Sequence, residues 1–331
     1  MAEQVKKYRN PVFDMMKGIG ILLVLWGHAP GISSLTDTFI SSFHMPLFFI
    51  LSGYFCQTTI DYSNWKNVLE KNFQRLVIPY LLTLCLIAAW FTIFAITRHD
   101  YSGLQLVVRK LIGKDNWTAE IGWMPIWFLM ALFWAKMLFY FISRMRPWVV
   151  MVVCTLISLL AVLLRMHFDF GMPFHFLRGC QALVFIAIGW WVRNNKLPIW
   201  IYLLCVACWL VQLANGASMT MFSIEYSCWP LNILAAVGGV WCLYLLCRKI
   251  HKVCEYKYFR FTQSILLWLG VCSLAIMCLH DVELNCSFIR IPMHRVPMVE
   301  TYCGTLVRYI ITIALVWFLS KWSWFRKIFI G

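Results

Sequence analysis

The most constraining feature of this sequence is a pair of apolar segments near the N-terminus that carry ionisable side chains. The first segment holds Asp14, Lys17 and His28, and the second, which runs to Phe55, holds His44. An apolar run of about 20 residues is long enough to cross a bilayer as a helix. Ionisable groups inside such a helix are costly, and they indicate a functional site with a protein or substrate partner. The sequence therefore predicts chemistry inside a membrane.

The composition extends this interpretation to the whole chain. Of 331 residues, 62% are hydrophobic and 13% are charged, whereas roughly 25% of a typical soluble domain is charged. We predict an all-α polytopic membrane protein with a single domain over residues 1–331 and about ten transmembrane helices. The predicted spans lie near residues 12–31, 38–56, 77–97, 123–142, 148–165, 174–192, 198–214, 229–247, 264–282 and 302–320. The amphipathic segment 101–121 is predicted to be an interfacial outer segment, because Gly113 and two charged residues interrupt it.

The distribution of lysine and arginine orients these spans. With the N-terminus inside, eighteen of these residues fall in inner segments and seven in outer segments. Cytoplasmic loops carry the excess of basic residues, so we predict an N-in and C-in topology. The formal net charge of +15 then reflects this bias and the attraction of basic loops to anionic membrane lipids, and no nucleic-acid partner is predicted.

The fourteen cysteines form no predicted metal site. Most lie within apolar runs, where a free cysteine behaves as a small hydrophobic residue. Cys286 and Cys303 flank one predicted outer loop, and whether they pair is left open.

The spacing within the first segment indicates catalysis. Lys17 and His28 are eleven positions apart, about three helical turns or roughly 16 Å, so both lie on nearly the same face as Asp14. A neutral imidazole can take a proton from a hydroxyl and return it to a leaving group, while the lysine stabilises an anionic donor and Asp14 orients that lysine. The structural alternative is that Lys17 reaches the inner interface and His28 lies at the outer one.

The sequence from Lys17 to His28 is similar to the Arg/Lys-x10-His signature of the membrane acyltransferase family called acyltransferase 3. This chain has lysine where many members have arginine, which replaces a two-pronged donor with a point charge. Further segments resemble the family in the same order along nearly the whole chain: FHMPLFFILSGYF at 43–55, KNFQRLVIPY at 71–80, MPIWFLMAL at 124–132, FIAIGWWV at 185–192 and SLAIMCLH at 273–280.

This resemblance implies a multi-pass enzyme of the bacterial cytoplasmic (inner) membrane. Its implied reaction moves an acyl group, most often acetyl, from cytoplasmic acyl-CoA to a hydroxyl of an envelope glycan or lipid-linked sugar, such as O-antigen, capsule or exopolysaccharide. Lys17 and His28 are the residues that the family needs for activity. Acyl-CoA is a donor substrate, and no permanently bound cofactor is expected. Direct transfer and a transient acyl-histidine both remain open, as do the acceptor sugar, the acyl length and a homo-oligomeric state.

Several further residues are candidates for substrate contacts. Lys71 and Arg75 lie in a predicted inner loop and suit the phosphates of acyl-CoA, although the positive-inside bias explains them equally well. Arg178 needs a partner at its depth in a span, for which Asp169 and Glu225 are the candidates. The remaining substrate-binding candidates, with Arg178, are His44, Ser52, Tyr54, Trp127 and His280. The alternatives are a structural role for His44, close backbone approach at Gly53 for Ser52 and Tyr54, aromatic packing for Trp127 and a position at the helix-end interface for His280.

The alternative function is a transporter or flippase for an envelope glycan or small solute, with Asp14, Lys17 and His28 as a relay. Transporters typically contain paired broken helices in two related halves. The sequence shows no such pair, which favours the enzyme.

Overall fold

The first described helix begins with an N-terminal cap at Asn10. In the computed structural model, which describes residues 10–56, 65–122, 124–253, 260–286 and 298–330, α1 (Pro11–Gly27) begins directly after Asn10. The Asn10 side chain accepts a hydrogen bond from the backbone N–H of Val12 at 3.0 Å, and Pro11 supplies a backbone already set for the first helical position. The helix ends at Gly27, so His28 is its C-terminal cap rather than an interior residue.

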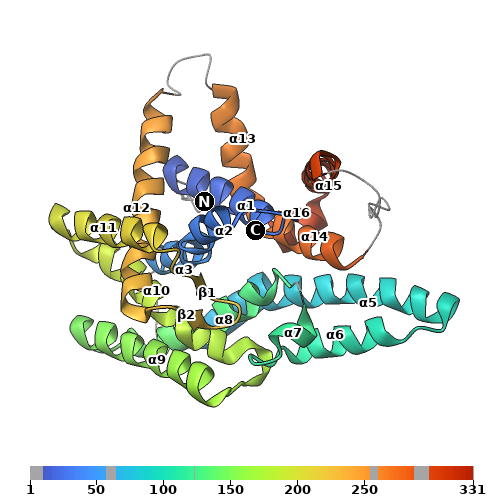
Figure 1. The fold of residues 1–331 in the computed structure, drawn as a ribbon, viewed down its shortest axis with the longest axis horizontal. Helices are drawn as coiled ribbons and strands as arrows, with labels where there is room; N and C mark the ends of the chain where they lie inside the picture. The colour runs from blue at the N-terminus through green and yellow to red at the C-terminus, as the bar shows by residue number, and fades with distance from the viewer. Residues whose placement is uncertain (1–9, 57–64, 123, 254–259, 287–297, 331) are drawn as a thin grey trace, which may run out of the picture.

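Most of the predicted spans correspond to one helix each, and these helices run in several different directions (Figure 1). These helices are α5 (Ile78–Arg98), α8 (Trp127–Ile142), α9 (Pro147–Phe168), α10 (Phe176–Asn194), α11 (Ile199–Ala214) and α12 (Trp229–Val253). Segment 101–121 forms two shorter helices, α6 (Ser102–Ile112) and α7 (Thr118–Ile121). Gly113 ends α6 in the left-handed region, with φ of +54°, which explains why this segment is not one continuous span.

The predicted span 38–56 is not one continuous helix, because the structure divides it into α2 (Ser34–Ser41) and α3 (His44–Tyr54). The residue between them, Phe43, is not helical, with φ of −145° and ψ of −15°. Pro46 explains the break, because its ring would clash with the carbonyl group of Ser42 if one helix ran through both residues.

The last two predicted spans are also not straight helices. The segment 264–282 consists of α13 (Arg260–Val271) and α14 (Ser273–Asn285), bent by 70° at Cys272, and α15 (Met298–Leu319) is followed by α16 (Ser323–Phe329) at 116°. The structure therefore contains two bent helix pairs that the sequence did not reveal, and both lie late in the chain rather than in two related halves. Four short elements complete the described structure: α4 (Trp65–Asn72), the π-helix η1 (Phe73–Val77), the 3-10 helix η2 (Pro173–His175) and a hairpin of β1 (Met219–Thr220) with β2 (Glu225–Tyr226).

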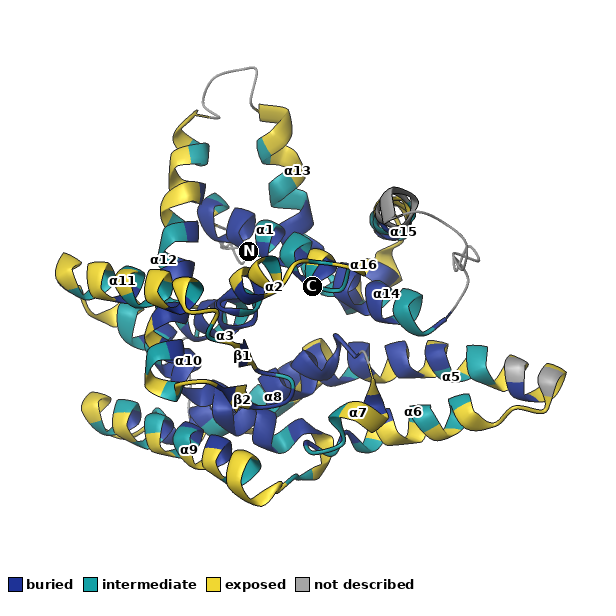
Figure 2. Ribbon diagram, viewed as in Figure 1, coloured by how far each residue is buried: buried dark blue, intermediate teal, exposed yellow. Residues whose placement is uncertain are grey.

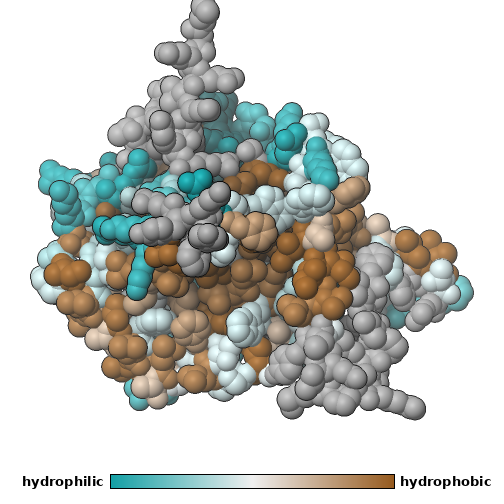
Figure 3. Space-filling view, turned by 90° about the horizontal axis from the view of Figure 1, so that it is seen from above, coloured by the Kyte–Doolittle hydropathy of each residue, from teal (hydrophilic) through white to brown (hydrophobic). Residues whose placement is uncertain are grey.

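The exterior of the protein is apolar, as expected for a chain in lipid. Among the described residues, four helices are long and apolar enough to cross a membrane, or up to six if each bent pair is one span. Hydrophobic side chains dominate the face seen in Figure 3, and hydrophilic ones gather toward its edge. The chain is thus an all-α membrane protein apart from the small hairpin, while the count of ten spans and the N-in, C-in topology stay predictions.

Contacts of two helices, α10 and α1, fix the position of the functional residues. The central helix α10 packs against α3, α8 and α9, and α1 packs against α13; α8 and α10 are largely buried in Figure 2, whereas α9 and α11 are widely exposed. At the contact between α1 and α13, a Cβ atom on Gly270 would lie 1.8 Å from the carbonyl oxygen of Asp14. Only glycine allows the two backbones to approach this closely.

The question of a Cys286–Cys303 disulfide falls outside the described residues, because the side chain of Cys303 is not among them.

Candidate functional site

One ion pair occupies the N-terminal half of α1. Lys17 Nζ lies 3.2 Å from Asp14 Oδ1, and their side chains are 30% and 12% exposed. The two residues are three positions apart, so they meet on one helix face. Lys17 Nζ also lies 5.4 Å from the ring centroid of Phe55, just beyond α3. The structure thus brings together the acid and the base that the sequence placed on one face, and Lys17 keeps partial access to solvent.

The other end of α1 presents a histidine to a second histidine from the far end of the chain. The ring centroids of His28 and His280 lie 5.4 Å apart, and the ring planes are tilted by 36°. His28 caps α1, whereas His280 is a fully buried residue in the middle of α14. α13 packs against α1 beside Asp14, and the chain then bends by 70° into α14, which carries His280.

His280 is held from one side by a carboxylate. His280 Nδ1 lies 3.0 Å from Glu283 Oε2, and the other carboxylate oxygen of Glu283 accepts hydrogen bonds from the guanidinium of Arg308 on α15. The ring of Tyr309 packs edge-on against the imidazole at a centroid distance of 5.5 Å. Among the described residues, the buried His280 Nε2 atom has no hydrogen-bond partner.

A third histidine lies within electrostatic range of this pair. His44, the first residue of α3, interacts electrostatically with His28. Its Nδ1 atom donates a hydrogen bond of 2.6 Å to the carbonyl oxygen of Ile40. This bond spans the break between α2 and α3, so His44 has a structural role at the break in addition to its place beside His28.

The sequence singled out Arg178 correctly as a buried charge, but both proposed partners are wrong. Arg178 Nη1 lies 3.3 Å from Asp115 Oδ1, and both side chains are fully buried. Asp169 instead pairs with Arg165, and Glu225 lies on the exposed side of β2. Burial raises the pKa of the Asp115 carboxyl to about 6, while the neighbouring guanidinium opposes that shift.

The remaining donors of Arg178 are also satisfied within the protein. Its Nε donates to the carbonyl oxygen of Phe222 at 2.6 Å, its Nη1 to His175 Nδ1 at 2.6 Å and its Nη2 to the carbonyl oxygen of Asp115 at 3.0 Å. The guanidinium also lies 4.5 Å above the Phe222 ring. Arg178 therefore ties the outer segment, α10 and the hairpin loop together.

Trp127 belongs to this same packed region. Its ring lies 6.0 Å from that of Phe222, centroid to centroid, and the residue is buried at the start of α8. Ser52 and Tyr54 lie near the end of α3 and are partly exposed. The Tyr54 ring packs against Phe13 at 4.7 Å, which places it beside α1 near the Lys17 end.

The two predicted acyl-CoA residues lie on exposed surfaces of one helical segment. Lys71 is exposed on α4 and Arg75 is exposed on η1, the π-helix that leads into α5. Short π-helical insertions often occur at functional sites, since the extra residue redirects the side chains that follow. The structure thus places an exposed cation on an irregular turn, and donor binding by Lys71 and Arg75 stays a prediction.

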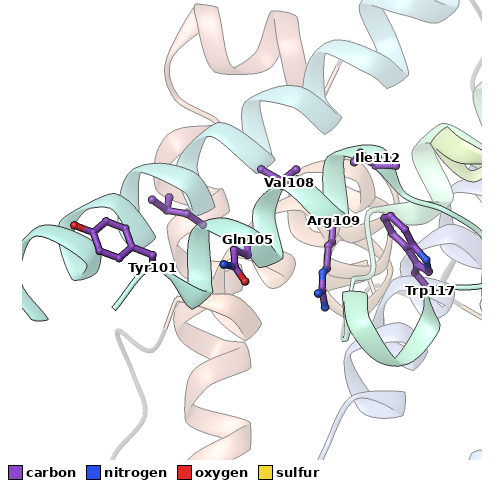
Figure 4. Close-up of a pocket in the computed structure, with 7 residues that line it drawn as sticks. Tyr101, Gln105, Val108, Arg109, Ile112 and Trp117 are labelled. Atoms are coloured by element: carbon purple, nitrogen blue, oxygen red, sulfur yellow. The ribbon is translucent and has the colours of Figure 1, made fainter. Parts of the chain in front are cut away.

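An open depression runs along α6. It is lined by Tyr101, Leu104, Gln105, Val108, Arg109, Ile112 and Trp117 (Figure 4). Apolar residues of α6 with Arg109 among them match the amphipathic, interfacial character predicted for this segment. No residue of the histidine site lines this depression.

Sequence reasoning missed the second half of the histidine site. Glu283 and Arg308 are ionisable residues within apolar segments, and that signal alone marks them as candidates with nearby partners. Glu283 also follows His280 by three positions, which puts both on one helix face. Asp281, fully buried next to His280 and interacting electrostatically with Lys110, carried the same signal.

Comparison with known proteins relates this chain to one family and one curated relative. The model of a family described as an acyltransferase domain, acyltransferase 3, matches residues 10–321. The nodulation protein NolL of Sinorhizobium fredii is 30% identical over 171 residues, which cover 47% of this chain and 43% of NolL. The chain therefore matches less than half the length of that relative. No solved structure matches.

Proposed function

Because this chain belongs to the acyltransferase 3 family, whose members are acyltransferases, we propose that it is an integral membrane O-acyltransferase with acyl-CoA as its donor. The transferred group is acetyl, and the acceptor is a hydroxyl of a cell-envelope carbohydrate or lipid-linked sugar. The enzyme works in the bacterial inner membrane, with lipids around it and the donor on the cytoplasmic side.

The observation that carries this proposal is the arrangement of α1. One end of this helix holds the partly exposed Lys17 beside Asp14, and the other end holds His28 beside His280. A cation suits a polarised or anionic donor group, and an imidazole suits proton transfer or attack at a carbonyl carbon. A donor that reaches from one end of α1 to the other would present its thioester at His28.

The chemistry at His28 can follow either of two routes. In direct transfer, His28 takes the proton of the acceptor hydroxyl as that oxygen attacks the thioester carbon, and the proton then goes to the departing thiolate. In the covalent route, a nitrogen of His28 attacks the thioester first, and the acceptor hydroxyl attacks the acyl-histidine. Lys71 and Arg75 are the proposed contacts for the coenzyme phosphates.

Bent helix pairs do not favour the transporter alternative here. Such pairs are typical of transporters, but the bend between α13 and α14 serves to place His280 against the end of α1. Family membership assigns the chain to the acyltransferases.

Acetyl transfer in membranes tests the proposal. Membranes that contain the wild-type chain, the His28→Ala variant or the His251→Asn variant at matched expression are incubated with radiolabelled acetyl-CoA. His251→Asn removes an imidazole that pairs with Gln263 on α13, away from the proposed site. We expect label in the glycan or lipid-linked sugar fraction with wild type and His251→Asn. With His28→Ala, the labelling of this fraction should fall at least about 100-fold. Equal incorporation by His28→Ala would remove His28 from the mechanism.

A further inference from the structure

The two neighbouring histidines, His28 and His280, differ in their contacts, which suggests different roles in the reaction. His280 has a carboxylate partner, Glu283, whose second oxygen is bound by Arg308. The neighbour of His28 across the site is the imidazole of His280. A catalytic base is typically oriented by a further group beside it. Glu283 occupies that position for His280, and His28 lies on the other side of the imidazole ring.

The contacts of Glu283 determine which nitrogen of His280 carries the proton. Arg308 donates two hydrogen bonds to one carboxylate oxygen of Glu283, so this carboxylate is held in its ionised form. An ionised carboxylate only accepts hydrogen bonds, so the neighbouring His280 Nδ1 must be the donor. The neutral ring therefore has its lone pair on Nε2.

That lone pair is buried and has no hydrogen-bond partner among the described residues. A buried acceptor without a donor is destabilising because it has lost its hydrogen bonds to water, and such an exception in a native structure calls for a functional explanation. In an O-acyltransferase, the group that brings a donor into the site is the acceptor hydroxyl.

We propose that His28 carries the acyl group and that His280, oriented by Glu283 and Arg308, is the base that activates the acceptor hydroxyl. This inference rests on the proposed function and decides between its two routes. His28 and His280 are catalytic residues in this scheme, and Glu283 and Arg308 are positioning residues.

The two steps balance without any further reactant. In the first step, the unprotonated nitrogen of His28 attacks the thioester carbon, the C–N bond forms, the C–S bond breaks and coenzyme A departs as a thiolate. In the second step, the acceptor oxygen attacks the acyl carbon, its proton passes to His280 Nε2, the C–N bond breaks and His28 leaves as neutral imidazole. The proton on His280 then passes to solvent and neutralises the thiolate there.

Separate measurement of the two steps tests this division. The purified full-length protein is mixed with radiolabelled acetyl-CoA without an acceptor, and the label on protein is followed over time. The excess donor is then removed, and the loss of label is followed in water and with a methyl hexopyranoside. Peptide mapping locates the label. The variants are His280→Asn, Glu283→Gln, Glu283→Asp, His28→Ala and the control His251→Asn.

Glu283→Gln is the sharpest of these variants, because it keeps the shape of the side chain. Arg308 would hold the amide oxygen, so the amide NH2 group faces His280 Nδ1 and forces the proton onto Nε2. The ring then offers a donor where the acceptor hydroxyl needs a lone pair. Glu283→Asp keeps the charge and should restore part of the activity.

We expect His280→Asn and Glu283→Gln to take up label on His28 at rates within about 3-fold of wild type, and to lose it about 100-fold to 10,000-fold more slowly. His28→Ala should take up none. A merely structural role for His280 would slow both steps, and thermal unfolding of each variant identifies a general folding defect. Loss of label at the wild-type rate by both variants would overturn the proposal, as would transfer by wild type without any labelled protein. A wild-type protein that neither takes up label nor transfers it would contradict the proposed function itself.

Discussion

The imidazole ring of His28 lies 5.4 Å from that of His280, centroid to centroid, although helices from opposite ends of the chain supply them. The contact depends on α1 packing against α13 and on the bend at Cys272 that turns α14 toward the end of α1. The site is therefore a product of the tertiary fold, and the following predictions test its parts.

Lys17 is expected to act through its charge. Lys17→Arg should keep most of the activity, whereas Lys17→Met should lower kcat/KM for acetyl-CoA roughly 10-fold to 100-fold, since a charged hydrogen bond contributes about 1.5–3 kcal/mol. Steady-state transfer at varied acetyl-CoA measures this effect. Lys321→Met, which removes a lysine stacked on Trp317 near the other end of the chain, is the control. Full activity of Lys17→Met would leave Lys17 as an interfacial residue only.

Arg75 is expected to contribute to donor binding rather than to chemistry. Arg75→Gln should raise the KM for acetyl-CoA about 10-fold with little change in kcat, because a lost phosphate contact weakens binding in the ground state and the transition state alike. The control is Lys66→Gln, which removes an exposed cation from the neighbouring helix α4. It should change neither KM nor kcat. Equal effects of both variants would indicate a general charge effect of the loop.

Breaking the buried Asp115–Arg178 pair should destabilise the protein strongly. Arg178→Met leaves a buried carboxylate without its cation, a change that typically costs about 3–5 kcal/mol. Asp169→Asn breaks the pair with Arg165, in which the aspartate side chain is 73% exposed, and should cost at most about 1 kcal/mol. Thermal unfolding in detergent compares the two. A similar small shift in the unfolding temperature of both variants would show that stability needs neither the Asp115–Arg178 pair nor the hydrogen bonds of Arg178 to carbonyl groups.

The glycine at the contact between α1 and α13 should be irreplaceable. In Gly270→Ala, the new methyl group would meet the Asp14 carbonyl oxygen at 1.8 Å, and the helices must separate at a cost of about 1–3 kcal/mol or more. Gly27→Ala, in the same α1, places its methyl group 3.4 Å from Ile40 and should be neutral in thermal unfolding or stabilising by up to about 1 kcal/mol. If Gly270→Ala unfolds at the wild-type temperature, the close approach is not needed.

Local patterns in the sequence predicted where helices lie, but they did not predict where a helix is broken. The spans around α5, α9, α10, α11 and α12 follow from apolar length and flanking Pro or charged residues, which depend only on the segment itself. The breaks were harder to predict. Pro46 inside the apolar run was the local signal for the break before α3. The segment around the bend at Cys272 contains no proline, so it holds no comparable signal.

The site shows the same division between local and tertiary information. Spacing within α1 predicted that Asp14 and Lys17 share a face, and the ion pair at 3.2 Å agrees with it. The pairing of His28 with His280 and of Arg178 with Asp115 joins distant segments. Hydropathy and helical periodicity describe each segment by itself, so they can mark a buried charge but cannot name its partner.

The packing of α1 against α13 and α14 also has a consequence for biosynthesis. His28 leaves the ribosome well before His280 and Glu283, which supply the imidazole opposite it and the carboxylate that orients that imidazole. His28 on the nascent α1 therefore meets these partners only once α14 has been made. A fragment that ends after α12 retains the whole signature motif, yet it lacks half of the site.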